Sequence, residues 1–185
     1  KSLRVSNKFA QRALAEDTIA STLRKLYLHD VTISNQEFFG ATVCQFHLDT
    51  ISFTKCTFGG ASLIPGIKGN TSVRDLLVSA CFNLPYQCLI DAFPSITSLR
   101  LHKLTQKTGG SITQLKDILC RTTNFPDMER LVLCDNSYYL NQARLQEIVS
   151  TRVGAGKLRD LEVSFETQKG PALSAFHVSD SNSLQ

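Results

Sequence analysis

The sequence contains no tryptophan and one methionine, and only 5 of its 185 residues are proline. No run of about 18 apolar residues occurs, so we expect no membrane-spanning helix. None of the 6 cysteines forms a Cys-x-x-Cys pair, which excludes the common zinc-ribbon and dithiol redox motifs. No glycine-rich segment leads into a Lys-Ser or Lys-Thr pair, so a phosphate-binding loop is also excluded. These absences predict a protein without a cofactor or metal.

A strong charge of one sign is also missing, since 20 Lys and Arg residues face 16 Asp and Glu residues and the net charge is +4. The cations are scattered along the chain, so we expect no nucleic-acid partner. The 42% of hydrophobic residues suffices for one sizeable core. The chain begins at Lys1 without an apolar signal segment, which suggests a processed protein or a fragment that lacks an N-terminal domain.

The cysteines are expected to be free thiols. They lie at positions 44, 56, 81, 88, 120 and 134. Most sit inside apolar stretches, where a free cysteine behaves as a small hydrophobic residue. Free thiols are typical of reducing compartments, so we expect a cytoplasmic or nuclear protein.

One spacing of apolar residues recurs six times. Each copy has an apolar residue, two spacers, an apolar residue, one spacer, an apolar residue, two spacers and a closing residue that is usually small or apolar. The copies begin at Leu23, Leu48, Val73, Ile96, Met128 and Leu158, at intervals of 25, 25, 23, 32 and 30 residues. The second copy has a rival frame that begins at Val43, but we prefer the frame that closes on Cys56. A repeated register of this kind predicts one structural unit per copy.

The spacing inside each copy predicts a short strand. Alternate side chains of a strand point to the same face, so the two closely spaced apolar residues would point inward. A single strand of this length cannot bury that face alone. Parallel stacking of strands from successive copies would build one continuous core.

The segments LRKLYLHDVTI, ITSLRLHKL, MERLVLCDN and LRDLEV resemble the leucine-rich-repeat family, whose unit is LxxLxLxxN/CxL. The resemblance covers about residues 20 to 166. It implies an α/β solenoid with a parallel strand ladder on the concave side and helices or loops on the convex side. We therefore expect a repeat domain over 1–166 and a mobile C-terminal tail over 167–185.

The segments between the strands predict several helices. We expect them over 7–20, after the capping-box sequence at 34–37, over 85–93, from Ser111 to Leu119, and from Asn141 to Gly154 or Gly156. Residues 59–72 are rich in Gly and Pro and predict a loop.

Two longer runs, LIDAFPSITSLRL and LQEIVSTRVGAGKLRDLEV, resemble the repeat regions of fungal F-box proteins. That likeness implies a substrate-recognition subunit of a cullin-based ubiquitin ligase, provided that an F-box lies outside this chain. Residues 84–93 resemble the start of an F-box, but a repeat helix is already expected there. The alternative is a ligand-recognition repeat region of an immune or regulatory receptor, because such receptors share the repeat unit.

A third alternative is a cysteine-dependent enzyme. His102 and Cys134 both follow the apolar pair of their copies, so adjacent strands would bring them together. A Cys–His pair can activate a thiolate. The sequence offers no third group to orient the histidine and no oxyanion loop, so we predict a protein that is not an enzyme.

The side chains that alternate with the apolar pair are expected to form a protein-binding surface. Tyr and Arg are favoured anchors in protein interfaces. The candidate partner-binding residues are Lys25, Tyr27, His29, Arg100, His102, Arg130 and Cys134.

Overall fold

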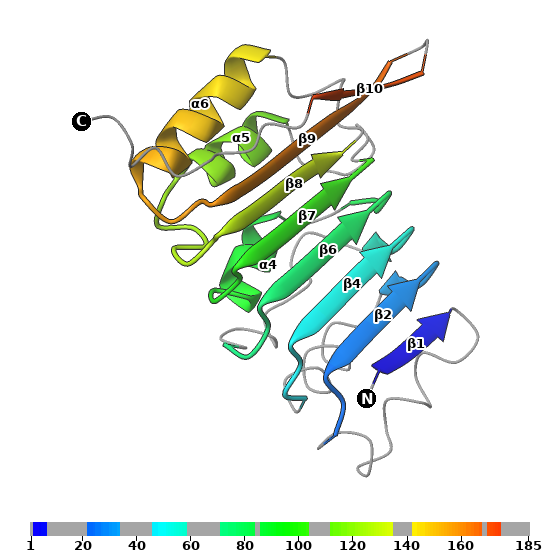
Figure 1. The fold of residues 1–185 in the computed structure, drawn as a ribbon. Helices are drawn as coiled ribbons and strands as arrows, with labels where there is room; N and C mark the ends of the chain where they lie inside the picture. The colour runs from blue at the N-terminus through cyan, green and yellow to red at the C-terminus, as the bar shows by residue number, and fades with distance from the viewer. Residues whose placement is uncertain are drawn as a thin grey trace.

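A computed structural model describes residues 2–6, 22–33, 46–58, 71–83, 86–103, 112–134, 142–167 and 170–174. Its main feature is an open eight-stranded sheet with the strand order β1-β2-β4-β6-β7-β8-β9-β10 (Figure 1). The strands are β1 (Ser2–Ser6), β2 (Lys25–His29), β4 (Thr50–Thr54), β6 (Asp75–Ser79), β7 (Ser98–His102), β8 (Arg130–Cys134), β9 (Asp160–Thr167) and β10 (Gly170–Ser174). All pairings from β1 to β9 are parallel, and β10 pairs antiparallel with β9. The predicted α/β class and parallel sheet are confirmed.

The six apolar copies align strand by strand. One inward row consists of Leu26, Ile51, Leu76, Leu99, Leu131 and Leu161, and the next consists of Leu28, Phe53, Val78, Leu101, Leu133 and Val163. None of these side chains is more than 3% exposed. Burial of one such side chain stabilises the fold by about 1.5–3 kcal/mol. Ile51 lies opposite Leu26, so the frame that closes on Cys56 is confirmed.

A repeated turn follows four of the strands. Asp30, Lys55, Ala80 and Lys103 each follow the last residue of a strand and have φ angles between 49° and 54°. That left-handed backbone costs about 1–2 kcal/mol in a residue other than glycine. A hydrogen bond accompanies it in each case: Asp30 N donates to Thr54 O over 2.9 Å, and Lys55 N donates to Ser79 O over 2.8 Å. Each turn is therefore tied to the end of the next strand.

Cys56 and Cys81 close the second and third copies and are fully buried. The Cys56 thiol donates to Leu28 O and the Cys81 thiol to Phe53 O, each over 3.4 Å. The hydrogen bond with Cys56, together with burial, raises the pKa of the Cys81 thiol. Both cysteines thus satisfy carbonyl groups of the preceding strand in the stack.

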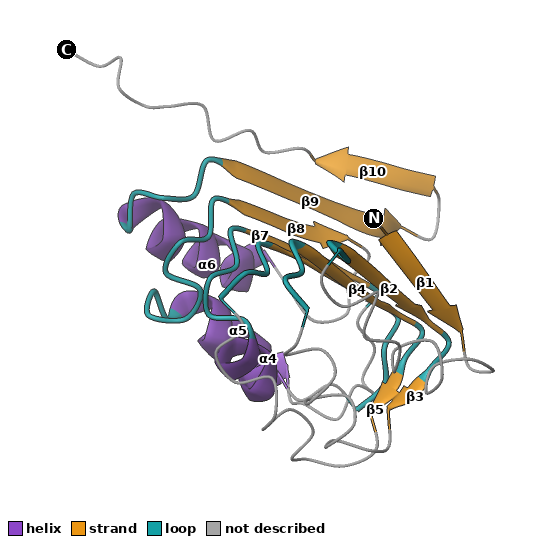
Figure 2. Ribbon diagram, turned by 90° about the horizontal axis from the view of Figure 1, so that it is seen from below, coloured by secondary structure: helices purple, strands orange, loops and turns teal. Residues whose placement is uncertain are grey.

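Three described helices and a small second sheet lie on one side of the main sheet (Figure 2). The helices are α4 (Tyr86–Ala92), α5 (Ile112–Cys120) and α6 (Gln142–Gly154), and they agree with three of the predicted helices. The second sheet pairs β3 (Thr32–Ile33) with β5 (Thr57–Phe58) in parallel. Helix α4 follows β6 and precedes β7 in the chain, so the helix expected over 85–93 is confirmed for Tyr86–Ala92. No described helix is long and apolar enough to cross a membrane.

Arg152 is a buried cation that joins α6 to the end of α5. Its side chain is 4% exposed. Nε donates to Leu119 O over 2.6 Å, Nη2 to Arg121 O over 3.0 Å and Nη1 to Phe125 O over 3.2 Å. Burial lowers the pKa of the guanidinium, whose ordinary value lies far above neutrality. One side chain thus donates to three carbonyl groups at and beyond the C-terminus of α5. The last carbonyls of a helix have no N–H donor within the helix.

The two ends of the chain differ from the expectations. Strand β1 occupies Ser2–Ser6, where the repeated spacing predicts no strand. Within the segment 167–185 that we expected as a tail, Gly170–Ser174 forms β10 and pairs with β9 through the register Gly170↔Thr167 to Ser174↔Val163. The expected helices over 7–20 and after 34–37, and nearly all of the loop over 59–72, lie outside the described residues.

Candidate functional site

One face of the main sheet carries the outward side chains, and no described element covers it (Figure 2). We call this surface the open face. Its central row consists of Arg4, Tyr27, Ser52, Leu77, Arg100, Val132 and Glu162 on successive strands. All seven candidate partner-binding residues belong to β2, β7 or β8 and lie at outward positions. The sequence therefore placed them on a common face.

The first group of candidates comes from β2. Lys25 and His29 are exposed, while Tyr27 between them is half-buried. The guanidinium carbon of Arg4 on β1 lies 5.6 Å from the centre of the Tyr27 ring. This cation–π contact links the Tyr27 ring on β2 to Arg4 on β1, and it stabilises the position of the ring by about 0.5–1 kcal/mol. Tyr27 is therefore a partly ordered aromatic group on the surface.

A strip of short side chains separates the two groups of candidates. Thr50 and Ser52 on β4 point outward, yet they are only 8% and 3% exposed. In the central row, Ser52 lies between Tyr27 and Leu77, and these longer side chains shield it. Because β2 and β7 are three strand spacings of about 4.8 Å apart, the two groups form separate contact points.

The second group comes from β7 and β8, and its charges differ in their partners. Arg130 is held by the acids of β9: its Nε lies 3.1 Å from Asp160 Oδ2, and its Nη2 lies 3.6 Å from Glu162 Oε2. These side chains are 39–47% exposed, so water screens the pairs and they add about 0–1 kcal/mol to stability. Arg130 is thus neutralised within the chain.

Arg100 lies on the neighbouring strand β7, and no described carboxylate neutralises its charge. Its side chain is half-buried, and its Nε atom is buried without a hydrogen-bond partner. No carboxylate among the described residues forms an ion pair with it. The nearby acid Asp75 lies opposite Ser98 in the register, not opposite Arg100. Arg100 is therefore a cation with unused donors.

His102 and Cys134 are opposite each other in the register of β7 and β8, as the sequence predicted. Opposite residues in adjacent strands lie about 4.8 Å apart in the ladder direction. Both side chains are half-buried. His29 occupies the same position on β2, three strands away, and does not join them. Within the described part of the chain, no three His, Cys, Asp or Glu side chains gather as metal ligands would.

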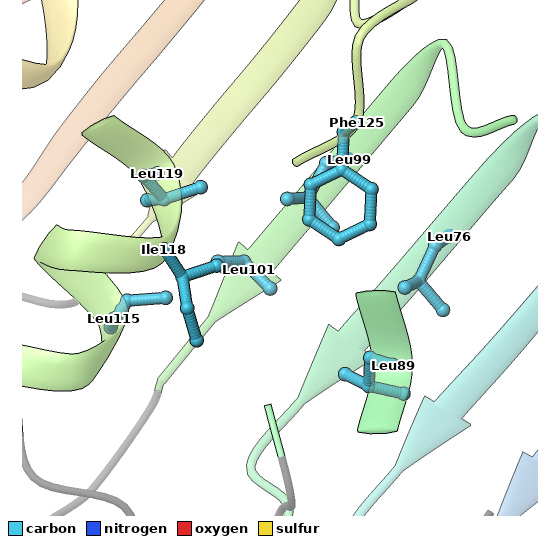
Figure 3. Close-up of a pocket in the computed structure, with 8 residues that line it drawn as sticks. All are labelled: Leu76, Leu89, Leu99, Leu101, Leu115, Ile118, Leu119 and Phe125. Atoms are coloured by element: carbon cyan, nitrogen blue, oxygen red, sulfur yellow. The ribbon is translucent and has the colours of Figure 1, made fainter. Parts of the chain in front are cut away.

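A small cavity lies on the other side of the sheet, between the strands and the helices (Figure 3). Its volume is about 10 Å³, and all of its lining residues are apolar. They come from β6, β7, α4, α5 and the segment after α5, and they are Leu76, Leu89, Leu99, Leu101, Leu115, Ile118, Leu119 and Phe125. A space of this size and polarity is a packing gap in the core.

The sequence pattern missed two features of the open face. Arg4 was not expected there, because the first copy of the repeated spacing was assigned only from Leu23 onward. The pairing of Arg130 with Asp160 and Glu162 was also missed. The signal for it was present, since the outward positions of β9 carry two acids and β8 precedes β9 in the stack.

The chain was also compared with known proteins. No protein-family model matches it, and neither the curated proteins nor the solved structures contain a significant match.

Proposed function

We propose that this chain is a leucine-rich-repeat solenoid that recognises another protein through its open face. The observation that carries the proposal is the open face itself, an in-register array of outward side chains that no described element covers. Stacked repeats of one strand each are the architecture by which solenoids present extended binding surfaces. The helices and the small second sheet act as support on the opposite side.

The composition of the open face supports a protein partner. Tyr27 offers apolar area and a hydroxyl with little entropy to lose, and it is already positioned by Arg4. Arg100 and Arg130 offer planar donor groups. Half-buried Leu77 supplies apolar contact between them and Tyr27. Mixed apolar, aromatic and Arg groups of this kind are enriched at protein interfaces.

The likeness to fungal F-box proteins supports a finer proposal, in which the open face recognises substrates of a ubiquitin ligase. Its test is co-precipitation of the full-length protein with cullin-complex subunits. Their absence from the precipitate, with the partner of the open face still present, would limit the function to protein binding. A nucleotide-binding domain in the full-length protein would favour the receptor alternative.

Replacing Tyr27 with alanine is expected to weaken binding of a purified partner by about 1–4 kcal/mol, the range of interface hot spots. The reason is the loss of an ordered aromatic side chain from the centre of the first group. The measurement is isothermal titration calorimetry with the partner recovered by affinity purification. Gln146→Ala, an exposed position on α6, is the matched control and should leave affinity unchanged. If Tyr27→Ala bound the partner as tightly as the wild type and Gln146→Ala bound it more weakly, the binding surface would lie on the helices.

A further inference from the structure

Arg100 and Arg130 occupy neighbouring strands of the open face but differ in one respect. Arg130 forms ion pairs with two carboxylates of its own chain. The Arg100 side chain forms no hydrogen bond or ion pair with any described residue, and its Nε is shielded from water as well. A buried donor without a partner costs about 1–3 kcal/mol, and such groups in folded proteins call for an explanation. A ligand group that binds on association is one explanation.

The surroundings of Arg100 indicate what that group would be. In the central row its neighbours are Leu77 and Val132, so an apolar residue flanks Arg100 on each adjacent strand. Val132 is 3% exposed, although it points outward. Along β7, Ser98 and His102 lie on the same face as Arg100. Apolar flanks reduce water screening around a charge, which strengthens its interaction with an opposite charge.

A carboxylate is the protein group that fits this arrangement. The planar guanidinium donates two parallel hydrogen bonds to the two oxygens of a carboxylate. The Arg100 side chain has no hydrogen bond within the described chain to lose when it turns toward a ligand. Among the chain's own acids on this face, Asp160 and Glu162 are engaged by Arg130, and Asp75, which lies opposite Ser98, forms no ion pair with Arg100.

We propose that Arg100 anchors an Asp or Glu side chain of the partner protein, with an apolar residue of the partner beside it on Leu77. This assignment rests on the proposed function, since it names the partner group that the open face recognises. It also separates the roles of the two arginines: Arg100 supplies the specificity for an acid, whereas Arg130 remains paired with β9.

The test uses random peptides displayed on phage and selected against the immobilised full chain. Peptides bound at the open face are expected to share one Asp or Glu, with an apolar residue nearby. For a synthesised peptide, Arg100→Gln and replacement of that acid by its amide should each raise Kd at least about tenfold, as loss of a hot-spot contact does. Because both changes remove the same contact, the two together should weaken binding no more than either alone.

Three variants separate the outcomes. Arg144→Gln on α6 removes the same charge from the helix side and should leave Kd unchanged. Two results would overturn the role of Arg100 and leave the proposed function standing. In the first, Tyr27→Ala weakens binding of the selected peptides, but these peptides share no acid. In the second, the peptides bind the Arg100→Gln variant as tightly as the wild type. A selection in which no peptide binds the open face, or in which only Arg144→Gln weakens binding, would overturn both. An unchanged thermal melting curve of Arg100→Gln shows that the variant remains folded.

Discussion

Replacement of Arg152 by alanine is expected to lower the free energy of unfolding by about 3–5 kcal/mol. The guanidinium donates to Leu119 O, Arg121 O and Phe125 O, and two of these three bonds are buried. Without it, carbonyl groups at the C-terminus of α5 lose their donors in a place that water reaches poorly. Hydrogen bonds from a charged group contribute about 1.5–3 kcal/mol each, but their losses are not additive.

Chemical denaturation followed by far-ultraviolet circular dichroism measures this effect. Circular dichroism is the suitable signal, because the chain has no tryptophan for fluorescence. Arg152→Lys keeps the charge but not the planar fork, so it should recover only part of the lost stability. Gln146→Ala on the same helix is exposed and should change stability by less than about 0.5 kcal/mol. Unfolding of Arg152→Ala at the wild-type midpoint would show that these hydrogen bonds are dispensable.

Replacement of Phe53 by alanine is expected to cost about 3–5 kcal/mol. The ring is fully buried beneath the sheet at the inward position of β4. Its centre lies 5.5 Å from that of the Phe58 ring on β5, at an interplanar angle of 61°, so the two form an edge-to-face pair. The substitution removes that pair and leaves a cavity between the main sheet and the small second sheet.

The chain offers a matched control for this substitution. Phe82 is 38% exposed at the end of its copy, so Phe82→Ala should cost well under half as much as Phe53→Ala. The measurement is the same denaturation series, with each transition checked for a change of slope. Comparable losses at the two positions would mean that the inward rows are not the source of stability. A smaller loss at Phe53 than at Phe82 would contradict the strand register.

The strands and their register could be predicted because each copy of the spacing specifies both a period of two and an inward face. Ile51 is opposite Leu26 as the preferred frame required, and the same offset continues to Leu161. Helices α4, α5 and α6 could be predicted from their apolar faces and terminal residues. Local patterns were sufficient for these elements, because each residue's role depends on near neighbours in sequence.

Other elements depend on contacts between distant residues and could not be predicted. Strand β10 begins with Gly-Pro and has no repeat spacing, so only its pairing with β9 defines it. Arg152 contacts carbonyls 27 to 33 residues away, and a single arginine in an amphipathic helix looks like a surface residue in the sequence. The same applies to the candidate site. The sequence identified Arg100 and Arg130 as equivalent, and only the ion pairs with Asp160 and Glu162 separate them.

The most direct test of the open face as the binding surface is site-specific photocrosslinking in the protein's native extract. A benzophenone amino acid at Leu77, a half-buried position in the centre of the open face, is compared with the same amino acid at exposed Gln146 on α6. We expect a defined covalent adduct with a protein partner from position 77, reduced by Tyr27→Ala, and none from position 146. An adduct from position 146 alone would contradict the assignment of partner binding to the open face.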